Sequence, residues 1–261
     1  MTSPELAAVL FDWGGTLTPW HAVDVRASWL AYAGAYHRGT DDRGADNLDA
    51  PDAVVLTVAE RLHRAEDAAW AAARDANRSS TLLDVVRAAG LDPLGAGHGP
   101  AMTAYEAAWE PHTWTDPDAE PTIRALRDRG LRVGLLSNTL WSRQTHERIL
   151  HRDRVLALFD AVVVSSEIEW TKPHPSAFAT AMAAVGVTDP ARVAFVGDRP
   201  FDDIHGAHSA GMRTVLVPHS QIPPAQHGPA AAEPDAVIDR LFDLVAVVDR
   251  WLAGATRPGP S

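Results

Sequence analysis

The stretch AAVLFDWGGTLT, residues 7–18, is the part of the sequence that decides the fold. It opens with a continuous apolar run, Asp12 follows that run, and Gly-Gly-Thr comes directly afterwards. A short, continuous apolar run is typical of a strand that is buried on both faces of a parallel sheet. The Asp12 carboxylate is therefore expected at the end of a strand, where it could attack a ligand.

Further runs of the same kind, rich in Val, Leu and Ala, lie at 132–137, 161–165, 193–197 and 213–218. Helical patterns separate the later runs, and a glycine closes three of these helices, at Gly130, Gly186 and Gly211. Alternating strands and helices imply right-handed crossovers and helices on both faces of the sheet. We therefore predict an α/β fold with a doubly wound parallel sheet.

Residues 18–112 contain no convincing strand. Their pattern predicts helices over 22–37, from Pro51 to Asn77, from the Thr81-x-x-Asp84 capping box to Gly90, and after Pro100. We expect this segment to be a helical cap inserted after the first strand, so that 1–17 and 113–261 form the core domain. A cap fits over the carboxyl edge of the sheet, because open α/β sheets bind their ligands there.

The sequence also predicts how the second helix of this segment packs and where a late loop lies. Within the second helix, Val54, Val58, Leu62 and Trp70 form a stripe at helical spacing, which is expected to pack in a core. The Pro- and Gly-rich stretch 218–234 predicts a loop before a last short strand and helix.

Composition limits the classes of function. The 261 residues carry a net charge of -11 and show no cluster of basic residues, which argues against binding to nucleic acid. No apolar run reaches the roughly 18 residues of a membrane span, and there is no basic segment typical of a signal peptide. We expect a cytoplasmic protein that binds a small molecule and no membrane; the oligomeric state stays open.

Four features that could carry chemistry follow successive strands. Asp12 follows the first, Ser137-Asn138-Thr139 the second and Gly197-Asp198 the fourth, while Lys172-Pro173 lies in the loop after the third. Each one alone is weak evidence, because such residues also cap helices and form turns. Together they indicate one site, because the parallel sheet brings all the strand ends to one edge.

In these features the chain resembles the haloacid dehalogenase-like superfamily of hydrolases, nearly from end to end. The family's first motif, Asp-x-Asp-Gly-Thr-Leu, is matched by DWGGTL except at its second acid, and the strand-end Ser or Thr by LLSNT. The lysine motif is matched by TKPHPSAF and the acidic fourth motif by VGDRPFDDIHGAHSAGM. The resemblance implies a Rossmann-like core, an α-helical cap of the first type, and catalysis through an aspartyl-phosphate.

The resemblance also assigns roles to residues. Asp12 would be the nucleophile, and Mg²⁺ would be held by Asp12, Asp198 and the backbone carbonyl of Gly14, an oxygen-only set that suits this ion. Either Asp203 or Asp202 would support the metal, because both spacings occur in the family. The phosphoryl oxygens would be held by Ser137, Asn138, Lys172, Gly15 and Thr16.

Lys172 is the only lysine among the 23 basic residues of the chain. A compact ammonium is the charge expected beside a nucleophile and a phosphate, and a chain that otherwise uses arginine has a lysine at this position. We interpret Lys172 as part of the catalytic machinery.

Gly14 stands where phosphatases of the family have the acid that protonates the leaving alcohol and then activates water. Losing that acid is expected to cost roughly 10²–10⁴ in rate if nothing replaces it. Either another group, such as His21, supplies the proton, or the substrate has a good leaving group, such as an acyl or anomeric phosphate.

Three other functions stay open as alternatives to a phosphatase. A 2-haloacid dehalogenase needs no proton donor, but the acids at 198, 202 and 203 argue against it, because those enzymes use no metal. A phosphonoacetaldehyde hydrolase, whose motif DWAGT is similar, requires a cap lysine that this chain lacks. A binding or regulatory protein that keeps the fold and has lost turnover is the remaining alternative.

Overall fold

The computed structural model describes residues 5–19, 23–40, 53–218 and 232–254. The chain divides into two compact units. Met1–His21 together with Trp114–Ser261 form the first, called here the core unit, and Ala22–Thr113 form the second, the helical unit. These limits lie within a few residues of the predicted insertion at 18–112.

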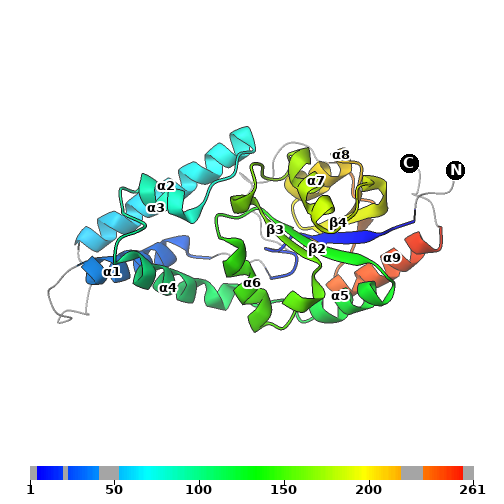
Figure 1. Ribbon diagram of the computed structural model, residues 1–261, viewed down its shortest axis with the longest axis horizontal. Coiled ribbons are helices and arrows are strands. Elements are labelled where there is room, and N and C mark those ends of the chain that lie inside the picture. Colours follow the sequence, from blue (N-terminus) through cyan, green and yellow to red (C-terminus); the bar gives the residue numbers. More distant parts are fainter. Residues whose placement is uncertain (1–4, 20–22, 41–52, 219–231, 255–261) are drawn as a thin grey trace. The chain divides into compact units, whose positions relative to one another are not determined.

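The core unit is built on a parallel sheet of six strands in the order β3-β2-β1-β4-β5-β6 (Figure 1). The strands are β1 (Ala8–Phe11), β2 (Arg132–Ser137), β3 (Ala161–Val164), β4 (Val193–Gly197), β5 (Arg213–Leu216) and β6 (Ala236–Val237). All neighbouring strands are parallel. The predicted α/β fold is confirmed, and each apolar run forms a strand within two residues of its predicted limits.

Helices cover both faces of this sheet (Figure 1). One face carries α5 (Ala119–Asp128), α6 (Arg143–Arg152) and α9 (Leu244–Leu252), and the other carries α7 (Pro175–Ala184) and α8 (Gly206–Ser209). Two separate apolar clusters result, one with Ile123, Leu150 and Val247, the other with Phe178 and Ala207. Strands buried on both faces explain why the runs are continuous and not alternating.

The helical unit contains α1 (Val25–Thr40), α2 (Ala53–Ala76), α3 (Leu82–Ala88) and α4 (His98–Trp109), followed by a short 3₁₀ turn at Glu110–His112. The predicted capping box is confirmed: Thr81 accepts a hydrogen bond from the Asp84 backbone, and the Asp84 side chain accepts one from the Thr81 backbone. The fourth helix is longer than expected, because it begins at His98 and includes Pro100 in its first turn, where the missing N–H costs no helical bond.

The buried face of α2 differs from the predicted stripe. Leu62 is buried, but Val54 is 51% exposed, and the buried positions are Val55, Ala59, Leu62, Glu66 and Ala73. Glu66 is tolerated in this interior because the Trp29 indole donates a hydrogen bond to its carboxylate at 2.6 Å. Burial, opposed by that bond, raises the pKa of Glu66 above its usual range.

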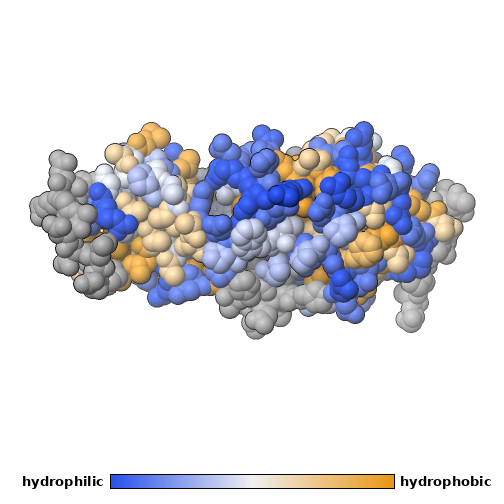
Figure 2. All heavy atoms as spheres, turned by 90° about the horizontal axis from the view of Figure 1, so that it is seen from below, coloured by the Kyte–Doolittle hydropathy of each residue, from blue (hydrophilic) through white to orange (hydrophobic). Residues whose placement is uncertain are grey.

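In the described part of the chain, no helix combines the length and the apolar character that crossing a membrane requires. On the face shown in Figure 2, hydrophobic residues gather in separate patches with hydrophilic residues between them. The predicted loop at 218–234 lies almost wholly outside the described residues.

Candidate active site

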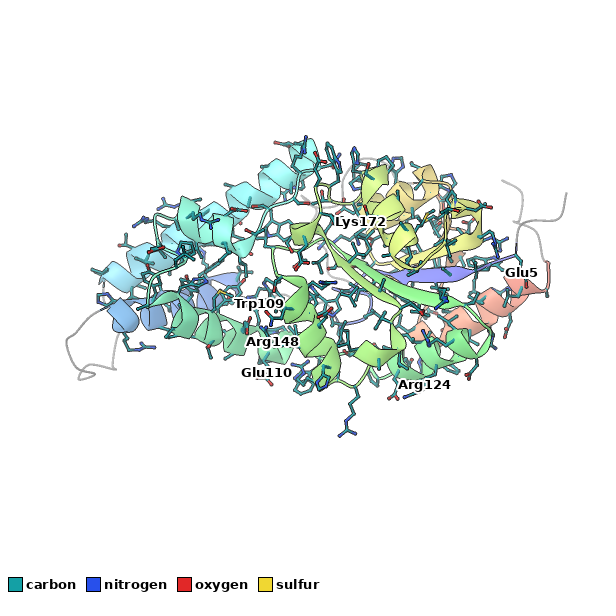
Figure 3. The ribbon with its side chains drawn as sticks, viewed as in Figure 1. Glu5, Trp109, Glu110, Arg124, Arg148 and Lys172 are labelled. Carbon is teal, nitrogen blue, oxygen red and sulfur yellow. The ribbon has the colours of Figure 1, made fainter. Side chains whose placement is uncertain are left out.

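The site lies where the order of the strands reverses. The chain passes from β1 to β2 and β3 on one side of the sheet, and then returns to place β4 on the other side of β1. Asp12 directly follows β1, and Asp198 directly follows β4. Open α/β sheets bind ligands outside the carboxyl ends of the strands at such a reversal. Glu5, before β1, and Lys172 lie toward opposite ends of the sheet (Figure 3).

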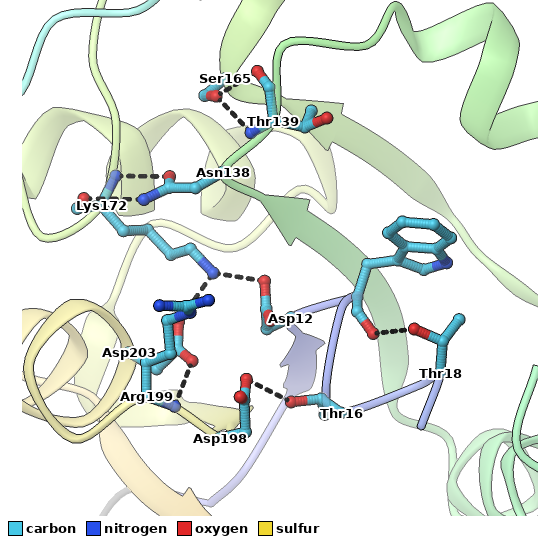
Figure 4. Close-up of polar contacts among 11 residues, drawn as sticks. Asp12, Thr16, Thr18, Asn138, Thr139, Ser165, Lys172, Asp198, Arg199 and Asp203 are labelled. Atoms are coloured by element: carbon cyan, nitrogen blue, oxygen red, sulfur yellow. Dashed lines mark hydrogen bonds and ion pairs between the residues drawn. The ribbon is translucent and has the colours of Figure 1, made fainter. Parts of the chain in front are cut away.

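Lys172 connects two carboxylates at this edge (Figure 4). Its Nζ donates to Asp12 Oδ1 at 2.6 Å and to Asp203 Oδ1 at 2.7 Å, and it lies 5.1 Å from the centre of the Phe195 ring. Burial alone would lower the pKa of the Lys172 ammonium, but the charges of Asp12 and Asp203 outweigh burial and raise it. Lys172 is therefore a fixed positive charge beside Asp12.

Asn138 holds the backbone of the same lysine. Its side-chain amide donates to the Lys172 carbonyl at 2.9 Å and accepts from the Lys172 N–H at 2.8 Å (Figure 4). Because Asn138 comes one residue after β2, these bonds tie the lysine loop to the end of that strand. A contact of this amide with phosphate stays a prediction.

Asp203 lies on a π-helical turn, Pro200–His205, and is fully buried. Its Oδ2 accepts from the Arg199 N–H at 2.9 Å, while its Oδ1 contacts Lys172. A side chain at Gly197 would overlap the Asp203 carboxylate, which explains why glycine precedes Asp198. Burial, assisted by Asp12 and opposed by Lys172, raises the pKa of Asp203.

The carboxylates of Asp12, Asp198 and Asp203 can place one oxygen each within 4.8 Å of one another, and all three residues are buried. One ammonium cannot neutralise three carboxylates, so the cluster keeps an excess of negative charge when all are ionised. An all-oxygen set of this kind fits Mg²⁺, a hard cation. Asp202, the alternative by spacing, is half-buried and lies outside this cluster.

The turn after β1 is ordered by its own backbone. The N–H groups of Thr16, Leu17 and Thr18 all donate to the carbonyl of Trp13, and Gly15 adopts a φ of 91°, a left-handed conformation that favours glycine. This pattern does not use the carbonyl of Gly14, the predicted metal ligand. Gly14 itself is not among the described residues with positive φ.

The remaining predicted residues surround the same edge. Ser137 ends β2 and is 3% exposed, and the Thr16 hydroxyl donates to Asp198 Oδ1 at 3.4 Å. Ser165, which the sequence did not single out, exchanges hydrogen bonds with the backbone of Thr139 and so joins the end of β3 to that of β2. His21, named as a possible acid, lies outside the described residues.

An aromatic cluster next to Asp12 was also missed. The rings of Trp13 and His146 meet edge to face at 4.8 Å, and Trp141 lies within 6 Å of both. His146 is fully buried, with its Nδ1 at 3.1 Å from the Ser142 carbonyl. Burial lowers the pKa of His146 to about 4, so this imidazole is neutral at pH 7. Residues on different elements make the cluster, so no single motif revealed it.

These features agree with the comparison of the chain with known families. A family model described as haloacid dehalogenase-like hydrolase matches residues 6–211. The chain belongs to the haloacid dehalogenase-like hydrolases. The predicted family is therefore confirmed, and Asp12, Ser137, Lys172 and Asp198 all lie inside the matched region.

Two curated proteins are similar to this chain in sequence. The chain is 33% identical over 164 residues to a glyceraldehyde 3-phosphate phosphatase of Methanopyrus kandleri, a match that covers 63% of this chain and 69% of that protein. It is 29% identical over 153 residues to the pyrophosphatase PpaX of Bacillus mycoides, covering 59% of this chain and 63% of the relative, less than two thirds of its length.

A solved 2-haloacid dehalogenase from Pseudomonas syringae has a TM-score of 0.59, with 22% identity over 94% of this chain and 99% of that one. At this identity the likeness shows the fold alone.

Proposed function

We propose that this protein is a Mg²⁺-dependent phosphatase that hydrolyses a small phosphorylated metabolite through an aspartyl-phosphate on Asp12. The observation that carries the proposal is Lys172, which contacts the nucleophile and an acid of the metal cluster at once. A dianionic phosphate is repelled by Asp12 unless positive charge accompanies it, and Lys172 with Mg²⁺ would supply that charge. The similar phosphatases support this class of reaction.

Each described residue then has a role. A carboxylate oxygen of Asp12 attacks phosphorus, and the bond from phosphorus to the leaving oxygen breaks with its electron pair. Lys172 offsets the negative charge on Asp12 and the phosphoryl oxygens, while Ser137 and the N–H groups of the turn after β1 hold these oxygens. Water then attacks phosphorus, the bond to Asp12 breaks, and inorganic phosphate leaves.

The metal would be held by Asp12, Asp198, Asp203 and the Gly14 carbonyl. When bound, Mg²⁺ neutralises phosphoryl charge and polarises the bonds to phosphorus. Thr16 would orient Asp198 through its hydroxyl, and Arg199 would orient Asp203 through its backbone N–H. The helical unit would be the inserted cap, and we expect it to determine which substrate is selected.

The observed contacts disfavour the other active readings. The buried acidic cluster is not needed by a metal-independent dehalogenase. A Schiff base on Lys172 requires a neutral amine, and its two carboxylate partners hold it charged. One alternative keeps a specific observation in its favour: Gly14 has no side chain that could transfer a proton, which also suits a binding or regulatory protein without turnover.

The test is phosphate release from 4-nitrophenyl phosphate by the purified protein, with Mg²⁺ and with EDTA, beside an Asp12→Asn variant. We expect release that requires both Mg²⁺ and Asp12. Asp12→Asn changes one atom and is a matched control for contaminating phosphatases. Equal and negligible rates for both proteins would support the binding protein instead.

A further inference from the structure

We propose that the substrates of this site are phosphates whose leaving group departs without a proton, namely acyl phosphates and phosphoric anhydrides, and not phosphates of simple alcohols. This inference rests on the proposed function and narrows its substrate class. It follows from the groups around Asp12 in the core unit that are considered in turn below.

The first step is the position of Gly14. It lies in the turn between Asp12 and Thr18, paired with Thr18 in an isolated bridge. Glycine has no side chain, so the position two residues after the nucleophile holds no acid that could reach a leaving oxygen. The turn is otherwise well ordered, with hydrogen bonds of 2.8 Å from Gly15 N–H to the Thr18 carbonyl and from Leu17 N–H to the Trp13 carbonyl.

The second step concerns the charged groups. Lys172 Nζ is 2.6 and 2.7 Å from two carboxylates and is 3% exposed as a residue. The ammonium is thus directed at these two carboxylates by its hydrogen bonds. Asp203 has one oxygen on Lys172 and the other on the Arg199 N–H. Neither group is placed to serve a leaving oxygen.

The third step concerns His146, whose imidazole interacts electrostatically with the Asp12 carboxylate. It is fully buried against Trp13, and its Nδ1 is hydrogen-bonded to the Ser142 carbonyl. Its Nε2 is enclosed and has no hydrogen-bond partner within the described residues. A ring in this position can fix Trp13 but cannot reach a bound substrate.

The last step concerns three hydroxyl groups. Thr16 donates to Asp198 and Thr18 to the Trp13 carbonyl, while Ser165 is bonded to the backbone of Thr139. Hydroxyl groups are in any case poor acids near neutral pH. These groups therefore offer positive charge for the phosphate, and none of them is placed to give a proton to the leaving group.

Without a proton donor, the basicity of the leaving oxygen determines which substrates can react. An alcohol oxygen leaves with the electron pair as an alkoxide, a strong base whose conjugate acid is about as weak an acid as water. A carboxylate leaving group has a conjugate acid with a pKa of about 4 and needs no proton. In the second half-reaction, water attacks phosphorus, Asp12 departs as a carboxylate, and the released water proton goes to phosphate or solvent.

The experiment compares leaving groups at saturating Mg²⁺ through kcat/KM, which covers steps up to departure of the leaving group. The probes are acetyl phosphate, a series of phenyl phosphates that differ in phenol acidity but little in shape, and glycerol 1-phosphate. Asp12→Asn gives the background of spontaneous hydrolysis. We expect kcat/KM to fall steadily with leaving-group basicity, and by at least roughly 10²-fold from acetyl to glycerol phosphate.

Two substitutions at one position sharpen the test. Gly14→Asp adds a carboxyl group, and Gly14→Asn adds a side chain of the same shape that cannot transfer a proton. Gly14→Asp should raise kcat/KM for glycerol 1-phosphate by roughly 10²–10⁴ and for acetyl phosphate by less than about tenfold. Gly14→Asn should keep the steep dependence of the native protein.

The outcomes separate this inference from the proposed function. Release from all probes with a flat dependence on leaving-group basicity would overturn the inference alone, because it would reveal a proton donor outside the groups considered above, such as His21. A uniform gain from Gly14→Asp, or an equal gain from Gly14→Asn, would also overturn it. No Mg²⁺-dependent release from any probe would overturn both.

Discussion

The side-chain amide of Asn138 satisfies both backbone polar groups of Lys172, donating to its carbonyl and accepting from its N–H. The two residues are 34 positions apart in the sequence and belong to different loops. An amide can make this pair of bonds because it carries a donor and an acceptor side by side. The position of the lysine backbone is thus set by the residue after β2, and the ammonium is then directed by Asp12 and Asp203.

Replacing Asn138 with Ala should disturb the lysine without removing any charge. We expect kcat to fall by roughly 10-fold to 100-fold, because a small displacement of a charge-stabilising group is costly, while KM for 4-nitrophenyl phosphate changes little. Steady-state kinetics on that substrate would measure the effects on kcat and on KM separately. A rise in KM with an unchanged kcat would contradict this expectation and favour direct contact between Asn138 and phosphate.

The charge on Lys172 should oppose the binding of Mg²⁺ to the acidic cluster. Lys172→Met removes this charge and keeps much of the side chain, so Mg²⁺ should bind at least about tenfold more tightly while phosphatase activity is lost. Calorimetric titration of Mg²⁺ gives a readout that does not depend on activity. Lys172→Arg, which keeps the charge, is the control; tighter binding there as well would show that charge is not the cause.

The neutral imidazole of His146 should make stability depend on pH. Its pKa falls to about 4 in the fold, against about 6.5 in an unfolded chain, so the unfolded state binds more protons below pH 6.5. The stability present above that pH is therefore lost as pH falls toward 4. Between pH 7 and pH 5 the expected loss from this one residue is about 2 kcal/mol.

His146→Phe keeps a ring against Trp13 and cannot titrate. Urea unfolding at pH 7 and pH 5 should show a smaller loss for this variant than for the native protein, by the amount given above. His146→Leu serves the same purpose if the larger ring does not fit. Identical losses in native protein and variant would mean that His146 is protonated as readily in the fold as outside it.

Most of the core unit could be predicted because its signals are local. Every strand of the parallel sheet except β6 lies in a stretch rich in apolar residues, and each of the four chemical features comes at or soon after a strand end. The stripe on α2 was less well predicted because Ala and Glu occupy its buried face. Alanine fits any environment, and a buried Glu66 depends on a hydrogen bond from the Trp29 indole of another helix, which a pattern within α2 does not reveal.

The π-helical turn and the aromatic cluster could not be predicted for a related reason. A π-helical turn differs from an α-helix by the carbonyl each N–H selects, here Ile204 N–H to the Arg199 carbonyl, and side-chain periodicity does not reveal that choice over six residues. Asp202 and Asp203 were equivalent by spacing, and the turn brings only Asp203 into the described cluster. The contact of Trp13 with His146 joins residues 133 positions apart and needs the tertiary fold.

The burial of Lys172 has a practical consequence. It is the only lysine in the sequence, and its side chain is 2% exposed. An acylating reagent specific for primary amines therefore has one internal target in the whole chain, shielded by the fold. Mass spectrometry of such labelling over time would report how often the interior of the site opens to solvent, and a bound phosphate analogue should slow the labelling.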